Sequence, residues 1–178
     1  PIPAHDTQER AHRARQQPVT PNDYSEIPFI ETAPDPVLRV LEQERGYLLF
    51  SRPIVEPVHP NTRPLEHERL TDLVAFATPG EFEPLTFSIY PVRDLRNLRV
   101  QVSPLVSGQD EIPATALTTR LATYWNMGYP RYTSRETYRR VPELLERVNE
   151  HSSPAYECLR WWITIHVPDD ATPGLYRG

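Results

Sequence analysis

Prolines recur along the whole of this chain and limit what it can fold into. There are 21 prolines in 178 residues, more than twice the share of roughly 5% found in average proteins. Because proline fixes φ and lacks an N–H donor, it interrupts helices and central strands. With only 6 glycines beside them, the prolines stay below the combined share of roughly 25–30% that marks low-complexity chains. The composition therefore predicts one folded domain of short strands with stiff connections.

Alternating apolar and polar residues predict where the strands lie. Such alternation buries one face of a strand and leaves the other wet, and several such runs with turns between them indicate an antiparallel sandwich. The strongest run, residues 159–167, places Trp161 and Trp162 on opposite faces, so one of them should lie in the core. We expect an all-β immunoglobulin-like or jelly-roll sandwich. Its strands are predicted at residues 47–50, 70–77, 85–90, 98–103, 117–122 and 159–167.

Two segments depart from this pattern. Residues 1–45 form an N-terminal extension whose first 34 residues hold too few apolar side chains to fold alone. A short helix is expected near residues 36–44, with Asp35 as its N-cap and Gly46 as its end. Residues 123–157 are rich in tyrosine and proline, and predict a long aromatic loop that carries a short helix near residues 142–149.

Charge and cysteine content narrow the possible partners. The net charge of −5 argues against a nucleic acid or an anionic membrane surface as the partner. No apolar run approaches the roughly 20 residues that a membrane-spanning helix needs, so no membrane insertion is expected. Every basic residue is arginine, which suits bidentate contacts at interfaces. The single cysteine, Cys158, should be buried and inert.

No pattern indicates catalysis, a cofactor or a metal. Glu81 and Glu83 lie two residues apart, as a carboxylate pair on one strand face would, but an ordinary turn explains them better. The Glu66-His67-Glu68 and Asp169-Asp170 groups are interpreted as solvated turns, because none of the histidines has a zinc-site spacing.

The sandwich region resembles a known domain. The resemblance rests on Gly46-Tyr47-Leu48-Leu49-Phe50, on Gly80-Glu81-Phe82-Glu83-Pro84, and on the ending Pro173-Gly174-Leu175-Tyr176-Arg177-Gly178. Residues 46–178 resemble the N-terminal β-sandwich domain, of unknown function, found in large bacterial glycoside-hydrolase-like proteins. In that family a catalytic barrel and further strands follow the domain. Here neither follows, so the sandwich is expected to lack its last strands.

Two functional hypotheses follow. The first is a non-catalytic structural subunit, extracellular or at the cell surface, that assembles with copies of itself, head to tail, into a fibre or oligomer. Its N-terminal extension would complete or cover a neighbour's sandwich, through Tyr24, Ile27, Phe29 and Ile30.

The second hypothesis is a carbohydrate-binding accessory domain of a larger glycoside-hydrolase-like enzyme. Aromatic side chains suit the apolar faces of pyranose rings. The candidates for stacking on a sugar are Trp125, Tyr129 and Tyr132.

Overall fold

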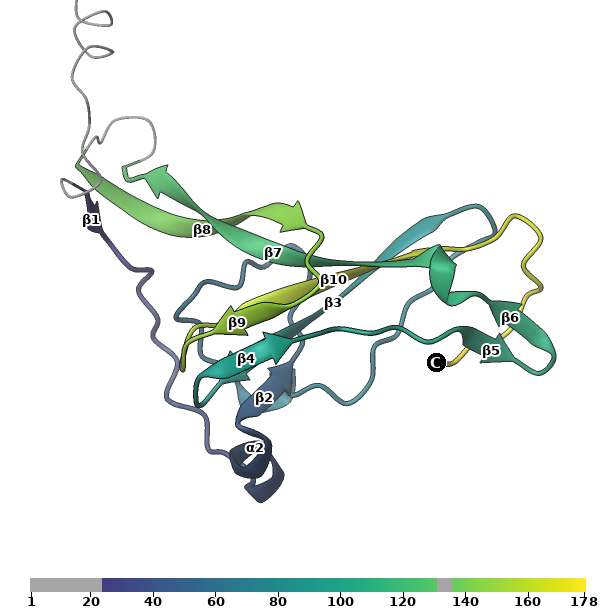
Figure 1. Ribbon diagram of the computed structural model, residues 1–178, viewed down its shortest axis with the longest axis horizontal. Helices are drawn as coiled ribbons and strands as arrows, with labels where there is room; N and C mark the ends of the chain where they lie inside the picture. The colour runs from purple at the N-terminus through teal and green to yellow at the C-terminus, as the bar shows by residue number, and fades with distance from the viewer. Residues whose placement is uncertain (1–23, 131–135) are drawn as a thin grey trace, which may run out of the picture.

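A six-stranded sheet runs through the centre of the chain (Figure 1). The computed structural model describes residues 24–130 and 136–178. All neighbouring strands are antiparallel except the first pair, which is parallel. The strands in spatial order are β1 (Ser25–Glu26), β8 (Thr137–Glu146), β7 (Leu117–Gly128), β10 (Leu159–His166), β3 (Phe82–Pro91) and β2 (Tyr47–Phe50). The predicted all-β fold is confirmed.

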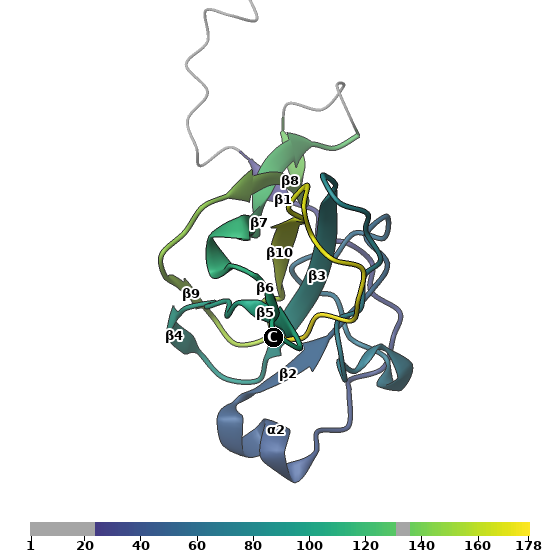
Figure 2. The same ribbon diagram turned by 90° about the vertical axis from the view of Figure 1, so that its right-hand side faces the viewer.

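One face of this sheet is covered by two small sheets (Figure 2). The first is formed by β4 (Leu95–Leu98) and β9 (His151–Ser153), and the second by β5 (Leu105–Ser107) and β6 (Asp110–Ile112). A 3₁₀ turn, η3 (Ala114–Ala116), leads from the second small sheet back into β7. The apolar side chains beneath these sheets include Trp161, which is 1% exposed. They are Ile89, Leu95, Leu121, Leu159 and Trp161 in one cluster, and Ile112, Ile165 and Val167 in another.

The opposite face is covered by chain without regular strands. The segment from residue 51 to residue 69 includes only one 3₁₀ turn, η2 (Glu66–Glu68). Beneath it lies a third cluster of buried side chains: Leu48, Phe50, Val58, Tyr90 and Cys158. The predicted burial of Cys158 is confirmed, and its thiol lies 3.0 Å from the carbonyl oxygen of Thr62. Burial raises the pKa of this thiol, so it stays protonated and unreactive.

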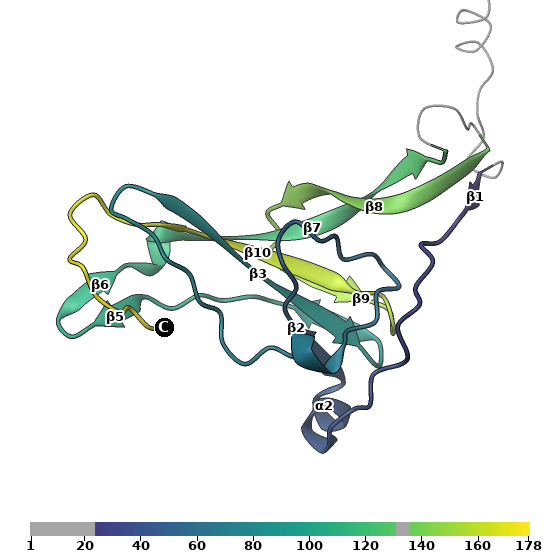
Figure 3. The same ribbon diagram turned by 180° about the vertical axis from the view of Figure 1, so that it is seen from behind.

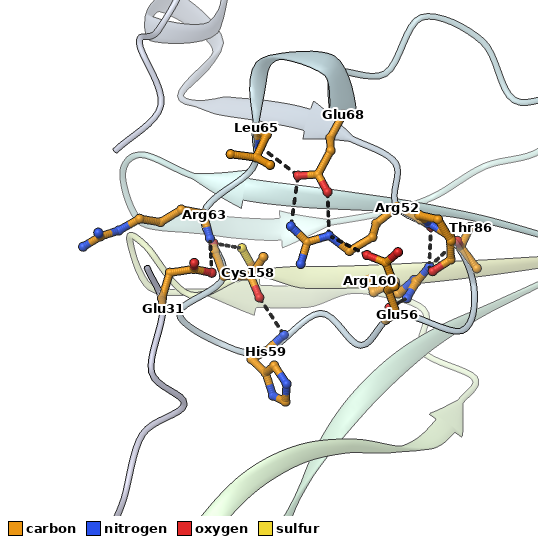
Figure 4. A network of polar contacts seen from close by, with 12 residues as sticks. Glu31, Arg52, Glu56, His59, Arg63, Leu65, Glu68, Thr86, Cys158 and Arg160 are labelled. Atoms are coloured by element: carbon orange, nitrogen blue, oxygen red, sulfur yellow. Dashed lines mark hydrogen bonds and ion pairs between the residues drawn. The ribbon is translucent and has the colours of Figure 1, made fainter. Parts of the chain in front are cut away.

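A buried arginine fastens that irregular segment to the sheet (Figure 4). Arg160 is 4% exposed, and its guanidinium donates to the carbonyl oxygens of Glu56 (2.6 Å), Arg52 (2.7 Å) and Pro53 (3.1 Å). It also donates to the hydroxyl of Thr86 on β3, at 2.9 Å. Within the described part of the chain no carboxylate pairs with Arg160, so carbonyl dipoles and a hydroxyl compensate the buried cation through its two terminal nitrogens, while its Nε has no partner there.

Ion pairs hold the rest of the segment. Arg52 donates to both carboxylate oxygens of Glu68, at 2.6 and 3.0 Å, and Glu68 also accepts from the backbone N–H of Leu65 (Figure 4). Arg69 instead bridges two carboxylates, pairing through NH1 with the buried Glu42 and through Nε with Glu66. Arginine suits these sites because its planar fork donates in two directions at once.

The N-terminal extension follows its own sheet from residue 24 onward (Figure 3). The N–H groups of Ser25 and Ile27 donate to the carbonyl oxygens of Glu136 and Tyr138, both at 2.8 Å. Further along, the ring of Phe29 stacks on that of His59, with centroids 4.0 Å apart.

The helix of the extension, α2 (Val40–Arg45), begins later than predicted. Asp35 and Pro36 lie in extended chain instead of capping it. Arginines distant in the sequence bind the chain before the helix: Arg63 donates to the carbonyl oxygen of Ala33 and Arg69 to that of Val37. The predicted end is confirmed, because Gly46 adopts φ 84° in the left-handed region.

Three other predicted elements are wrong. Residues 142–149 do not form a helix, because β8 runs to Glu146 and pairs with β7. Pro142 is tolerated there because β1 pairs with β8 only at Thr137 and Tyr138, which leaves the outer side of β8 unpaired at Pro142, and because Pro142 adjoins a bulge. Residues 70–77 are not a strand: the ladder stops after Leu70, and Phe76 is 90% exposed. The strand expected at 98–103 ends at Leu98.

The last residues of the chain make one bridge. Val106 and Arg177 exchange both backbone hydrogen bonds, at 2.7 and 3.0 Å. Residues 175–178 therefore pair with β5 at a single position.

Replacing Arg160 should destabilise the fold. Arg160→Met keeps most of the side-chain volume but leaves the carbonyl groups of Arg52, Pro53 and Glu56 without their donor. We expect the free energy of unfolding in urea to fall by about 2–4 kcal/mol. Arg99→Met is the matched control, because Arg99 and its partner Glu150 are both exposed, and it should change stability by less than about 0.5 kcal/mol. Equal effects in the two variants would contradict the role given to Arg160.

Stability should also fall in acid. Burial raises the pKa values of Glu42 and Glu68, but hydrogen bonds to backbone N–H groups and to Arg69 and Arg52 outweigh it, so both pKa values lie below the usual range. A carboxyl whose folded pKa is lowered stabilises the fold above its unfolded pKa and loses that contribution as pH falls through the folded value.

The free energy of unfolding should therefore be steady from neutral pH to about 5 and decline below about pH 4.3. Urea titrations across this range measure it. The double variant Glu42→Gln/Glu68→Gln should be less stable at pH 7 and decline less steeply, whereas Glu44→Gln, which alters an exposed side chain, should follow the native profile. An unchanged slope in the double variant would contradict this assignment.

Candidate functional site

The β7–β8 hairpin extends beyond the small sheets that cover the core (Figure 1). Leu121, near the middle of β7, is buried under β4 and β9. Side chains alternate along a strand, so Thr123, Trp125 and Met127 project from the same face as Leu121. Past the covering layer this face is open, and Trp125 is 58% exposed.

The register of β8 adds more side chains to this open face. Trp125 lies opposite Val141, and Met127 lies opposite Arg139. The guanidinium of Arg139 lies 3.6 Å from the centroid of the Tyr129 ring, a cation–π contact that places Tyr129 on the same face. We call this surface the hairpin face. It consists of Thr123, Trp125, Met127, Tyr129, Arg139 and Val141.

The spacing of the two rings suits an extended ligand. Trp125 and Tyr129 are four positions apart on one strand, which separates their Cα atoms by about 13 Å at roughly 3.3 Å per residue. Both are more than a third exposed, at 58% and 38%. Two exposed rings at this distance on a twisted strand can contact separate units of one polymer chain.

Polar groups lie between and beside the rings. The hydroxyl of Thr123 and the Nε of Arg139 are shielded from solvent and have no hydrogen-bond partner among the residues that the structure describes. Stacking on Tyr129 fixes the plane of the Arg139 guanidinium. The hairpin face thus combines flat apolar surfaces with a guanidinium held in place, as ligand sites commonly combine apolar and polar groups.

The other face of the hairpin is anchored to the domain. The hydroxyl of Tyr124 donates to the carbonyl oxygen of Cys158 at 2.7 Å, and burial raises the pKa of Tyr124 well above its usual value, so it remains a donor. Arg140 pairs with Glu26 of β1 and with Glu157, both at 2.9 Å. These contacts hold the hairpin in one orientation relative to the sheet.

The structure brings together two of the three predicted sugar-stacking residues. Trp125 and Tyr129 share the hairpin face, whereas Tyr132 lies outside the described residues. The predicted aromatic loop is replaced by two long strands. Sequence reasoning missed Arg139, because a residue taken for part of a loop gives no indication of which face it occupies.

The four residues assigned to assembly lie on the chain's own domain. Ile27 is half-buried beside β8 and Phe29 stacks on His59. Tyr24 and Ile30 are exposed, at 36% and 74%. Whether copies of the chain meet through them stays a prediction.

The remaining candidate residues take local structural roles. The carboxylate of Glu81 accepts from the backbone N–H of Thr78, at 2.7 Å, and Glu66 and Glu68 pair with arginines. In the described ranges no three His, Cys, Asp or Glu side chains gather closely enough to hold a metal ion.

Of the two tryptophans on β10, Trp161 is in the core and Trp162, on the other face, is half-buried. A search of the described helices for one both long and apolar enough to span a bilayer finds none.

Comparisons with known proteins relate this chain to others by its fold. No protein-family model and no curated protein matches the sequence. Among solved structures, a family 123 glycoside hydrolase from Clostridium perfringens is similar, with a TM-score of 0.52 and 16% sequence identity. The match covers 56% of this chain and 18% of the hydrolase, so the chain corresponds to a small part of that protein. Over the matched 56%, the chain therefore has a fold similar to that of one part of a glycoside hydrolase.

Proposed function

We propose that this chain is a non-catalytic carbohydrate-binding accessory domain of a glycoside-hydrolase-like protein. The observation that carries the proposal is the hairpin face, where Trp125 and Tyr129 lie exposed on one strand beside Arg139. Polysaccharides present alternating apolar ring faces and hydroxyl edges. Exposed aromatic rings with fixed polar neighbours complement both.

The rigidity of the hairpin supports this function. A ligand that binds a preorganised surface loses less free energy to the ordering of side chains. The Tyr124–Cys158 hydrogen bond and the Arg140 ion pairs fix the far side of the hairpin, and the contact with Arg139 fixes the ring of Tyr129. The exposed indole of Trp125 then stands on a strand that is already held.

The structural neighbour supports the same class of function. That neighbour is a glycoside hydrolase studied for glycolipid glycan hydrolysis, and this chain matches 18% of its length. A domain of this size beside a catalytic domain can hold the substrate near the active site. We place no catalytic residue in this chain, because Glu81 accepts a hydrogen bond within a turn, and Glu42 and Glu68 bind arginines.

Assembly into a fibre is the less favoured function. Strand addition needs an accessible, regular edge, and the side of β8 that β1 leaves unpaired is interrupted by Pro142 and a bulge. Ile27 and Phe29, which would dock on a neighbour, already contact their own domain. An extracellular location, expected for either function, belongs to the proposal.

Replacing Trp125 should weaken carbohydrate binding. Affinity gel electrophoresis against soluble polysaccharides such as xylan, mixed-linkage glucan and galactomannan should show retardation of the native domain by at least one of them. Trp125→Ala should reduce that affinity about tenfold or more, a loss of about 1.4 kcal/mol per factor of ten. Tyr129→Ala should have a similar effect, because the ring and its hold on Arg139 are both removed.

Phe76→Ala is the matched control. Phe76 is 90% exposed and lies outside the hairpin face, so its removal should leave the retardation unchanged. Thermal melts should show that all three variants fold. Binding that survives the loss of both Trp125 and Tyr129, or that fails for every polysaccharide tested, would contradict the proposed function.

A further inference from the structure

A hollow of about 500 Å³ lies away from the hairpin face, between the N-terminal extension and the sheet. Its size falls within the range of roughly 300–1,000 Å³ typical of small-molecule sites. It combines apolar, aromatic and charged side chains from four separate parts of the chain. The lining residues are Asp35, Pro36, Leu38, Asn61, Arg63, Tyr90, Val92 and Tyr156.

Tyr156 lies at this hollow in a backbone conformation that is unusual for a residue with a bulky side chain. Its φ is 64°, in the left-handed region that a bulky residue rarely adopts, and the residue is 61% exposed. Hydrogen bonds hold the turn there: the N–H of Tyr156 donates to the carbonyl oxygen of Pro91, and that of Ala155 to the carboxylate of Asp94. Strained backbone of this kind concentrates at ligand sites. Packing does not account for the ring, because most of it faces solvent.

A second tyrosine faces the first. The ring centroids of Tyr90 and Tyr156 are 6.1 Å apart and the rings are tilted by 58°. Tyr90 is 6% exposed, and none of the residues in the described ranges accepts a hydrogen bond from its hydroxyl. The pair thus offers one exposed ring and, deeper in the hollow, one hydroxyl that can bind a ligand.

Charged and amide groups complete the lining. The Nε of Arg63 pairs with one carboxylate oxygen of Asp35 at 3.0 Å, and its NH1 donates to the carbonyl oxygen of Ala33. Figure 4 shows the Arg63 side chain pointing away from Cys158 and the Arg52–Glu68 pair. The side-chain amide nitrogen of Asn61 donates to the backbone carbonyl oxygen of Phe29. The second oxygen of Asp35, the NH2 of Arg63 and the amide oxygen of Asn61 make no further contact among the described residues.

We propose that this hollow binds a single neutral sugar residue, with Tyr156 stacked on one face of the ring and Asp35, Asn61 and Arg63 bound to its hydroxyls. The opposite charges of Asp35 and Arg63 cancel, which favours a neutral ligand over an ion. Hydroxyl groups both donate and accept, as this mixed set of carboxylate, amide and guanidinium requires. The site is separate from the hairpin face and does not depend on the function proposed there.

The test is a nuclear magnetic resonance titration of the ¹⁵N-labelled domain with D-glucose, D-galactose and D-mannose, each added separately. At least one sugar should shift the backbone signal of Tyr156 and the side-chain amide signal of Asn61 in a saturable way. The same titration of Trp125→Ala should give the same shifts, which separates this site from the hairpin face. Shifts with none of the three sugars, or only at the hairpin face, would overturn the proposal.

Two substitutions of Tyr156 separate ligand binding from folding. Asparagine tolerates the left-handed region, so Tyr156→Asn should melt at the same temperature as the native domain or higher, yet bind the sugar about tenfold more weakly. Tyr156→Phe keeps the stacking ring and should retain most of the affinity. Unchanged binding in Tyr156→Asn would show that the ring takes no part, and would overturn the proposal.

Discussion

The buried guanidinium of Arg160 is the contact on which the rest of the structure depends. An isolated cation is costly to bury, and here it is compensated by three carbonyl groups of the segment that covers the sheet and by one hydroxyl of β3. That segment has few backbone hydrogen bonds of its own. Arg160 fixes its first residues against the sheet, and the Arg52–Glu68 pair fixes its last. A cover without strands is thereby given a defined shape.

This arrangement determines where side chains stay exposed. The covering segments end before the tip of the β7–β8 hairpin, so the apolar face of the sheet continues into the open at Trp125 and Tyr129. On the other side of the sheet, the N-terminal extension runs over the covering segment, and the hollow at Tyr156 lies between the extension and the sheet. An extended surface on one side and a hollow on the other suit different parts of a carbohydrate: several units of a polymer, and a single sugar residue.

The sequence predicted the elements whose signals are local. The alternating run through Trp161 and Trp162, the burial of Cys158 and the end of the helix at Gly46 are all confirmed. Each of these depends on strand periodicity or on the backbone freedom of one residue. The class of fold follows from the same signals.

What the sequence could not predict depends on distant partners. Leu144 and Leu145 have helical spacing with Val148, but pairing with β7 places them in a strand. The helix begins at Val40 and not at Pro36, after a stretch in which arginines far along the sequence bind the carbonyl groups of Ala33 and Val37. The contact of Arg139 with Tyr129 and the place of Tyr156 in the hollow likewise arise only once separate segments meet.

The most direct test is to follow the three tryptophan indole signals in a ¹H–¹⁵N spectrum while an oligosaccharide that the domain binds is added stepwise. Trp125 is 58% exposed on the hairpin face, whereas Trp161 is buried in the core. The account predicts that the Trp125 indole signal moves until the domain is saturated and that the Trp161 signal stays in place. Saturable binding that leaves the Trp125 signal unmoved would contradict the claim that the hairpin face is the carbohydrate site.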